Sequence, residues 1–354
     1  MNISRFINNE FIQCEAEFVT PAFLGGADQS AELRTASFKA ALRWWWRVLY
    51  EAQHKDKIYE KESELFGSTD GASKVRIEIF GALSTQTPNF LRNNFNGEKI
   101  YIKTIKTKDG RDKRIEIDAI DYLAYGLYAY EKGDIDRKAG NVYNRDYFNV
   151  SLPFKINIYI EKENNKSKDE IIMCLKALFI FGGIGSRSRN GFGSLHLINN
   201  TLPNITTKID FLQRKPQEYP TLNQASRLFE TKEEFSNWEG ALSKVAIAYK
   251  NARSKLEPKH KFEIRGLLSR PIEVKGEYIA ETTRKRRSPK QFIMHIAKTP
   301  DNKYVGRILT LPIIFYEKDK KGDYNNMIDS MYKSLNESMN DKTSNILKLL
   351  GAAK

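Results

Sequence analysis

The chain has 354 residues, a length that suits two domains better than one small domain. Its formal net charge of +14 predicts a polyanionic partner, most commonly nucleic acid, with an anionic membrane surface as the rival. No apolar run is long enough to cross a membrane and the N-terminus lacks a signal-peptide core, so we expect a cytoplasmic protein without a membrane partner. Four scattered histidines and two cysteines show no zinc-site spacing, and we expect neither metal nor cofactor.

Apolar periodicity predicts alternating strands and helices in the first half of the chain. The strands are expected at residues 10–19, 75–83, 99–106, 152–161 and 194–198, and the helices at residues 36–54, 117–131 and 167–181. With elaborations, this is the order strand–helix–strand–strand–helix–strand of the ferredoxin-like plan. We therefore predict an α+β fold.

The second half is predicted to be a shorter or degenerate version of the same plan. Pro203, Pro216 and Pro220 place the junction after residue 200, giving domains at residues 1–200 and 201–354. Helices are expected at residues 231–256 and 324–339, and strands at residues 262–268, 291–297 and 307–315. Thr231 and Glu234 form a capping box for the first of these helices. No glycine-rich loop matches that of the first half, so we expect this domain to dock on other proteins.

The predicted helix at residues 36–54 carries an apolar stripe and a cationic face. Phe38, Leu42, Trp45 and Leu49 share the stripe, while Lys39, Arg43 and Trp46 lie on another face. Two interpretations are open. The rings fill crevices and the cations are solvated, or the cations hold phosphates while Trp46 packs on a sugar, a base or a partner.

Residues 182–194 place five glycines and two arginines between a predicted helix and a predicted strand. Glycine lets the backbone approach a ligand closely, and successive amides can form a concave anion nest. Arg187 and Arg189 are suited to bidentate phosphate contacts. The alternative is a glycine-rich hairpin turn. Walker and dinucleotide-binding patterns do not fit, because the loop follows a helix and lacks Gly-Lys-Ser/Thr.

This loop, GGIGSRSRNGFGS, closely resembles the glycine-rich loop of the RAMP superfamily, the RNA-binding proteins of CRISPR effector complexes. A second segment, residues 20–28 (TPAFLGGAD), is followed by Arg34 and by residues 37–47, and it resembles the opening of the first-subunit family of the Cmr (type III-B) complex. The two motifs lie more than a hundred residues apart in the expected order. The likeness covers most of the first half and is weaker around residues 287–289.

The resemblance implies tandem ferredoxin-like (RRM-like) domains and a non-catalytic subunit. Its partners would be single-stranded guide RNA, held at its 3′ portion, target RNA, and other Cmr-complex subunits. The implied RNA-binding residues fall in the glycine-rich loop and on the tryptophan helix: Gly183, Gly185, Ser186, Arg187, Arg189 and Gly191, with Lys39, Arg43, Trp46 and Arg34. Arg284, Lys285, Arg286 and Arg287 form a second basic patch, either a solvated loop or a nucleic-acid contact.

Two alternative functions remain open on the sequence. Some RAMP proteins cut RNA, and Asp28 and His196 are the residues that could do so here. A turn role for Asp28 and a core or surface role for His196 are the more conservative interpretations. The other alternative is a scaffold subunit that contacts only protein.

Overall fold

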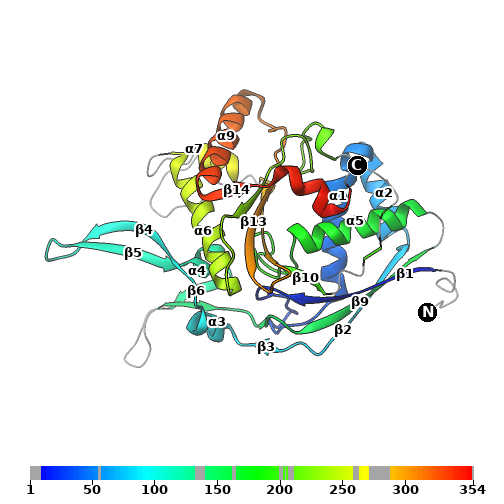
Figure 1. Cartoon of the computed structure of the whole chain (residues 1–354), viewed down its shortest axis with the longest axis horizontal. Helices are drawn as coiled ribbons and strands as arrows, with labels where there is room; N and C mark the ends of the chain where they lie inside the picture. Colours follow the sequence, from blue (N-terminus) through cyan, green and yellow to red (C-terminus); the bar gives the residue numbers. More distant parts are fainter. Residues whose placement is uncertain are drawn as a thin grey trace.

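Two four-stranded antiparallel sheets organise the chain, each with its own helices (Figure 1). The computed structural model describes residues 9–54, 57–131, 140–161, 165–198, 202, 203, 205, 211–257, 263–270 and 288–352. The fold is therefore mixed α and β, in agreement with the predicted class. No helix in the part of the chain described is long and apolar enough to cross a membrane.

The first sheet has the strand order β10-β1-β9-β2. Its strands are β1 (Asn9–Phe18), β2 (Val75–Phe80), β9 (Pro153–Glu161) and β10 (Leu195–Ile198), and its helices are α1 (Thr35–His54) and α5 (Asn165–Phe181). In β1 every second residue from Ile12 to Phe18 is buried, which is the period expected when one face of a sheet is covered. In chain order these six elements run strand–helix–strand–strand–helix–strand.

The second sheet has the order β12-β13-β11-β14. Its strands are β11 (Leu228–Thr231), β12 (Phe292–Lys298), β13 (Tyr304–Thr310) and β14 (Met339–Asp341), with helices α6 (Trp238–Lys255) and α9 (Lys321–Ser338). These elements follow one another in the same order as those of the first sheet. Their spatial arrangement also matches, because in both sheets the first strand lies between the third and the fourth.

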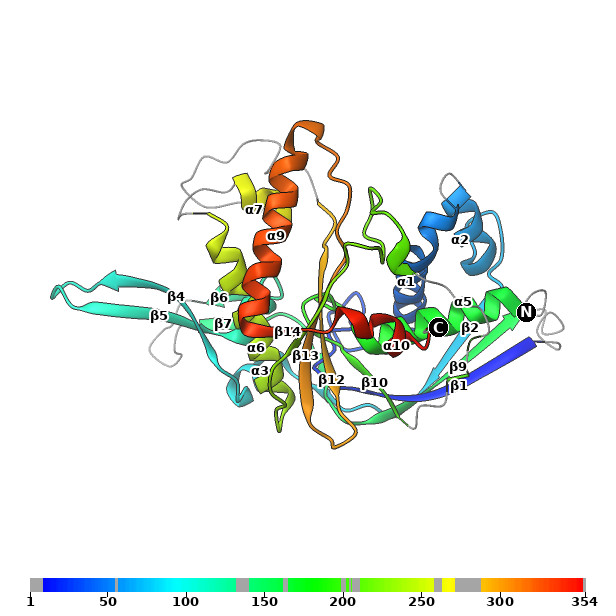
Figure 2. The same ribbon diagram turned by 45° about the horizontal axis from the view of Figure 1, so that its top comes forward.

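Between β2 and β9 the chain makes a long excursion. It contains β3 (Thr85–Gln86), α3 (Pro88–Asn94), β4 (Lys99–Lys106), β5 (Asp112–Asp118), α4 (Ala119–Leu123), β6 (Tyr128–Glu131), β7 (Gly140–Tyr143) and β8 (Tyr147–Phe148). The β4–β5 hairpin extends well away from the body (Figures 1 and 2). The segment after it returns and packs α4 against α6. The excursion therefore brings residues near 120 beside the second half of the chain.

Smaller helices complete the structure. They are α2 (Ile58–Phe66), α7 (Glu263–Leu268), α10 (Ile346–Leu350) and the short 3-10 turns Phe211–Gln213, Lys318–Lys320 and Thr343–Asn345. The last helix, α10, lies against α5 of the first half (Figure 2). Ile346, Leu350 and Ala352 are buried in the same apolar cluster as Trp45 and Ile172. The end of the chain thus contributes to the core around the first sheet.

Two predicted elements were wrong in type or extent. Residues 263–268, predicted as strand, form helix α7, whose first amides are capped by the Glu257 carboxylate; the Arg265 amide donates to it at 3.2 Å. The helix predicted at residues 117–131 ends at Leu123 and is followed by strand β6. Local periodicity in such short apolar runs does not separate helix from strand.

The predicted capping box is also wrong. Thr231 is the last residue of β11, and α6 begins at Trp238. Asn237 caps α6 instead, its side chain accepting a hydrogen bond from the Gly240 amide at 2.9 Å. The pairing of residues 228–230 with β13 and of Thr231 with β14 overrides the local Ser/Thr-x-x-Glu pattern.

Candidate nucleic-acid interface

The glycine-rich loop leaves α5 and enters β10, as predicted, and it packs closely on the segment after β1. The Ser186 amide donates to the carbonyl of Phe23 and the Gly193 amide to that of Pro21, both at 2.9 Å. A Cβ at Gly193 would lie 2.0 Å from the carbonyl oxygen of Ile184, and the φ of Gly193 is +59°. The glycines therefore allow tight backbone packing.

Most loop amides that an anion nest would need are engaged within the protein. Those of Ser186, Ser188, Asn190, Gly191 and Gly193 all donate to backbone carbonyls. The predicted nest is thus wrong for these five amides, because the loop is folded on itself and on residues 20–24. The side chains of Arg187 and Arg189 are therefore the groups of the loop that remain to bind an anion.

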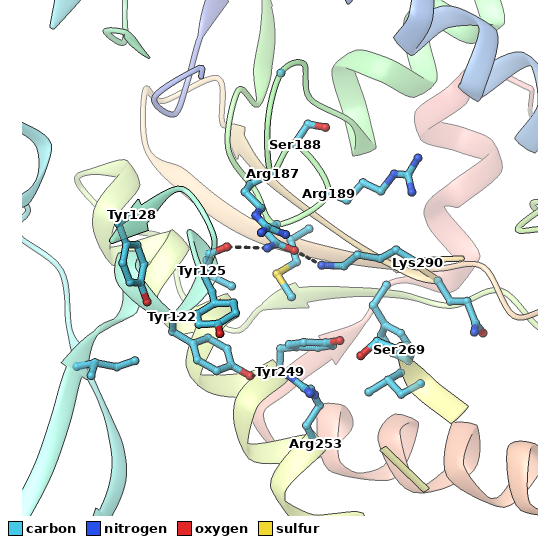
Figure 3. A pocket seen from close by; sticks show the side chains of 18 residues that line it. Tyr122, Tyr125, Tyr128, Arg187, Ser188, Arg189, Tyr249, Arg253, Ser269 and Lys290 are labelled. Atoms are coloured by element: carbon cyan, nitrogen blue, oxygen red, sulfur yellow. Dashed lines mark hydrogen bonds between the residues drawn. The ribbon is translucent and has the colours of Figure 1, made fainter. Parts of the chain in front are cut away.

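A hollow of about 730 Å³ opens beside the loop (Figure 3). Five parts of the chain line it: the loop, the segment from Ile117 to Tyr128, the C-terminal half of α6, the end of α7, and the start of β12 with the two residues before it. None of the described residues that line it is acidic. Its size is within the range of small-molecule and nucleotide sites.

Four cations gather at this hollow: Arg187, Arg189, Arg253 and Lys290. No described carboxylate pairs with any of them, although buried or half-buried cations elsewhere, such as Arg270 and Arg307, each have a glutamate partner. Lys290 donates to the side-chain oxygen of Asn190, which in turn donates to the Leu123 carbonyl at 2.6 Å. Burial, together with the neighbouring arginines, lowers the pKa of Lys290 to about 7. The hollow is therefore an uncompensated basic site, suited to an anion.

Tyrosines form the other part of the lining. Arg253 donates to the Tyr122 hydroxyl at 3.2 Å and lies over the Tyr249 ring at 5.8 Å. Burial raises the pKa of Tyr249 to about 12, so its phenol stays neutral and does not balance the cations. Tyr125 stands at the rim with 73% of its surface exposed. Cations interleaved with aromatic rings are the usual means of holding single-stranded nucleic acid.

Arg189 connects this hollow to a second one. Figure 3 shows its side chain pointing away from Arg187 and Lys290, and its guanidinium lies 4.7 Å from the centre of the Trp44 ring. Trp44 and Arg189 both line hollows of about 300 Å³, beside α1, and about 210 Å³, which also contains Tyr59 and Tyr219. The three hollows form a basic and aromatic track along the loop, called the loop track below.

The cations predicted on α1 lie off this track. Arg43 pairs with Glu62 at 2.6 Å, and Arg34 lies 3.7 Å from Glu32. Lys39 is partly buried, and its pKa is lowered by burial and by Arg43. None of these three lines the loop track. On α1, the second hollow is lined by Ser37, Ala40, Ala41, Trp44 and Trp45. The third is lined by Trp44, Arg47, Val48 and Glu51.

The prediction that Trp46 faces RNA is wrong, because the ring is buried. It is 1% exposed, its indole N–H donates to the Glu170 carboxylate at 2.8 Å, and His54 stacks on it. Trp45 is buried as predicted. Three successive tryptophans turn by about 100° each, so one must face away from the other two. That residue is Trp44, which lines the loop track.

Conservative changes should separate the two outer tryptophans. Trp46→Phe is expected to lower the free energy of unfolding by about 1–3 kcal/mol, because the buried Glu170 carboxylate loses its indole donor. Trp44→Phe should change it by less than about 0.5 kcal/mol, because a half-buried ring still meets Arg189. Urea unfolding followed by circular dichroism measures both. Equal losses in the two variants would contradict this assignment.

The two candidate catalytic residues lie in structural settings. Asp28 accepts hydrogen bonds from the Ser30 amide and hydroxyl at 3.1 and 2.7 Å, which lower its pKa, and it closes a turn. His196 lies in β10 opposite Glu17, and burial lowers its pKa. Neither lines the loop track. Among the residues that the structure describes, no group of histidine, cysteine or acidic side chains is arranged to hold a metal ion. The basic run from Arg284 to Arg287 lies outside the described residues.

The sequence interpretation missed Tyr122, Tyr125, Tyr249, Arg253 and Lys290. Tyr122 and Tyr125 lie more than a hundred residues before Tyr249, Arg253 and Lys290, so no local spacing relates the two groups. Tyr122 and Tyr125 were included only in the helix predicted at residues 117–131. The apolar stripe did not single out Trp44, since Trp44 and Trp46 both lie off it and only Trp45 belongs to it.

Comparison with known proteins identifies the family. The model of the RAMP superfamily matches residues 15–196, just over half of the chain. The chain belongs to the RAMP superfamily. Residues 182–194 and the segment after β1, on which the resemblance was based, both lie inside the matched region.

Curated relatives are Cmr subunits of CRISPR systems. The chain is 27% identical to subunit Cmr1-2 of Pyrococcus furiosus over 187 residues, which cover 51% of this chain and 91% of that protein. It is 25% identical to Cmr1-1 of the same organism and 23% identical to Cmr1 of Saccharolobus solfataricus, each match covering 47% of this chain. These two matches span only 41% and 48% of the relatives' own lengths.

Solved structures share the fold over most of the chain. The crystal structure of apo Cmr1 from Pyrococcus furiosus aligns with a TM-score of 0.51 at 17% identity, covering 91% of this chain and 96% of that one. A chain of the type III-B Cmr-beta complex bound to cognate target RNA aligns with a TM-score of 0.53 at 12% identity, covering 92% and 99%. The chain is therefore a RAMP-superfamily protein that is similar to Cmr subunits of type III-B systems.

Proposed function

We propose that the chain is a non-catalytic, RNA-binding subunit of a type III-B CRISPR ribonucleoprotein in antiviral defence. It would hold the guide RNA at its 3′ portion, help to capture target RNA, or do both. The loop track carries the proposal, because the four cations of its largest hollow have no described carboxylate partner and alternate with aromatic rings. The relatives' names and the likeness to a chain of an RNA-bound Cmr complex support the same assignment.

Two ferredoxin-like units at residues 1–200 and 201–354 are part of the proposal. Both sheets place their first strand between the third and the fourth, which is the order of that plan. The first unit would supply the glycine-rich loop and Trp44. The second would supply Arg253 and Lys290 to the same track, and its remaining surface would dock on neighbouring subunits.

RNA binding is tested by fluorescence anisotropy with a labelled single-stranded RNA of mixed sequence, titrated across a salt series. The Arg187→Ala/Arg189→Ala variant is expected to bind about ten-fold more weakly than the wild type. Loss of two phosphate contacts should also make the slope of log affinity against log salt shallower by about 1.4. Lys333→Ala/Lys348→Ala removes two exposed cations from α9 and α10, off the track, and should bind like the wild type.

The same mixtures, run on denaturing gels, test the alternatives. Intact RNA agrees with a non-catalytic subunit. RNA cut by the wild type but not by Asp28→Ala or His196→Ala would make the chain an endoribonuclease. No binding by the folded wild type at low salt would contradict the proposal and indicate a scaffold that contacts only protein.

A further inference from the structure

Strand β12 of the second sheet lies against the first half of the chain, where it contacts β10 and α5 (Figure 2). It is an edge strand, since it stands at one end of the order β12-β13-β11-β14. The Met294 amide donates to the Arg189 carbonyl at 3.1 Å. The Ile296 amide donates to the Ser194 hydroxyl at the same distance. Alternate amides of an edge strand point away from its partner strand, and here the glycine-rich loop accepts two of them.

Between these two residues, the His295 side chain contacts the beginning of the loop. It is fully buried, and its Nδ1 lies 2.7 Å from the carbonyl oxygen of Gly182. Burial and the neighbouring Arg307 lower the pKa of His295 to about 3, so the ring is neutral and Nδ1 donates its hydrogen to that carbonyl. Its Nε2 is buried without a hydrogen-bond partner among the described residues. An aliphatic side chain would avoid this unpaired nitrogen, so the bond to Gly182 accounts for a histidine here.

The loop arginines belong to a segment of tight turns. Three amides of this segment donate to the carbonyl three residues earlier: those of Ser188, Asn190 and Gly191. Arg189 lies within these turns, and the bond from Met294 to its carbonyl ties it to the second half of the chain. Its guanidinium lies 4.7 Å from the centre of the Trp44 ring and lines two hollows of the loop track. A shift of β12 would therefore move this guanidinium relative to Trp44.

Resting on the proposed function, we propose that β12 sets the conformation in which the glycine-rich loop binds RNA, and that His295 is a positioning residue for the loop. His295 is buried and acts through Gly182, at the place where the loop leaves α5. The first unit carries the arginines of the loop, and the second unit holds them in place. A protein that docks on the second unit and shifts β12 would change the affinity for RNA, and RNA would change the affinity of that docking by the same factor.

The test replaces His295 in the full chain by leucine, which donates no hydrogen bond, and by asparagine, which can offer an N–H near the position of Nδ1. His295→Leu is expected to bind the labelled single-stranded RNA about five-fold more weakly than the wild type in fluorescence anisotropy. His295→Asn should restore most of that loss. Urea unfolding of each variant sets a temperature at which all are folded.

Tyr332→Phe is the matched control. It removes a half-buried hydroxyl that donates to the Ala225 carbonyl at 2.7 Å, between α9 and the segment before β11. It should lower stability and leave the affinity for RNA unchanged. RNA affinity as in the wild type for folded His295→Leu would make His295 a structural residue only and overturn the inference. Equal losses of affinity in His295→Leu and His295→Asn would overturn the role of the Nδ1 bond.

Hydrogen–deuterium exchange of the free protein gives a second readout that needs no RNA. In His295→Leu, the amides of residues 186–194 are expected to exchange about ten-fold faster than in the wild type, because the loop loses the bond at its start. Tyr332→Phe should leave their exchange unchanged. Unchanged exchange in His295→Leu would show that β12 does not hold the loop through this residue. If the wild type binds no RNA, the proposed function fails, while the exchange rates still decide whether His295 positions the loop.

Discussion

Replacing Gly193 with alanine is expected to lower the free energy of unfolding by about 4 kcal/mol or more. The new Cβ would lie 2.0 Å from the Ile184 carbonyl oxygen, and the φ of +59° is unfavourable for alanine. The contacting atom is backbone on a segment that the loop itself holds in place, so it cannot move away without breaking the Ile184–Gly193 hydrogen bond of 3.0 Å. Urea unfolding followed by far-ultraviolet circular dichroism measures the change.

A matched control is available at Gly322, the second residue of α9. A Cβ there would meet nothing within 4 Å, and alanine favours helix. Gly322→Ala is therefore expected to raise the free energy of unfolding by up to about 1 kcal/mol. Equal urea midpoints for Gly193→Ala and the wild type would show that the loop backbone is not held as closely as the structure has it.

RNA affinity is expected to fall about thirty-fold between pH 6 and pH 8.5. Lys290 has a pKa of about 7 in the free protein, because burial and three arginines disfavour its charge. A bound phosphate favours the charged form and raises that pKa. Binding therefore takes up a proton above pH 7, and affinity decreases by up to about ten-fold per pH unit there. Below pH 6 this lysine is already charged and contributes no further change.

Besides Lys290, one other group on the loop track titrates in this range. Asn190 beside the ammonium is neutral, and the Tyr249 ring, 5.9 Å away, stays protonated because burial raises its pKa to about 12. Glu51 lines the hollow of about 210 Å³, and burial raises its pKa to about 7. Its ionisation would also weaken RNA binding above pH 7. Anisotropy titrations of Lys290→Arg and Glu51→Gln, alone and combined, separate the two contributions.

The pH dependence of RNA affinity in Lys290→Arg shows whether Lys290 or Glu51 causes the effect. Arginine stays charged across the whole range, so this variant should lose most of the pH dependence while keeping affinity for RNA at pH 6. If the pH dependence of RNA affinity stays as in the wild type in Lys290→Arg and disappears in Glu51→Gln, it is due to the Glu51 carboxylate. Persistence in the combined variant would show that neither group is responsible.

The sequence predicted the elements that local pattern determines. The stripe of α1, the alternation of β1 and β9, and α5 were all foreseen, because a long periodic segment has one way to bury its apolar face. The glycine-rich loop was also placed correctly between α5 and β10. Among the short elements, β11 was missed and α7 was predicted as a strand, because pairing with β13 and capping by Glu257 determine them.

The candidate site was predicted only on the side that one segment provides. Arg187 and Arg189 were identified because they share a loop with the glycines. Lys290 and Arg253 gave no signal, because their role depends on the approach of two halves of the chain. The prediction for Trp46 was wrong for the same reason, since Glu170, whose carboxylate accepts a hydrogen bond from the buried indole, lies 124 residues away. Sequence spacing describes neighbours along a helix and not the partners that a fold brings to it.

The position of α10 has a consequence for synthesis in the cell. Ile346 and Leu350 complete a core that otherwise consists largely of residues before 200. The ribosome synthesises those earlier residues long before it reaches residue 346. The apolar face of α5 that α10 covers therefore stays exposed to solvent during that interval. A nascent chain can therefore form the first sheet early but cannot close the core behind it until almost all of these 354 residues have emerged.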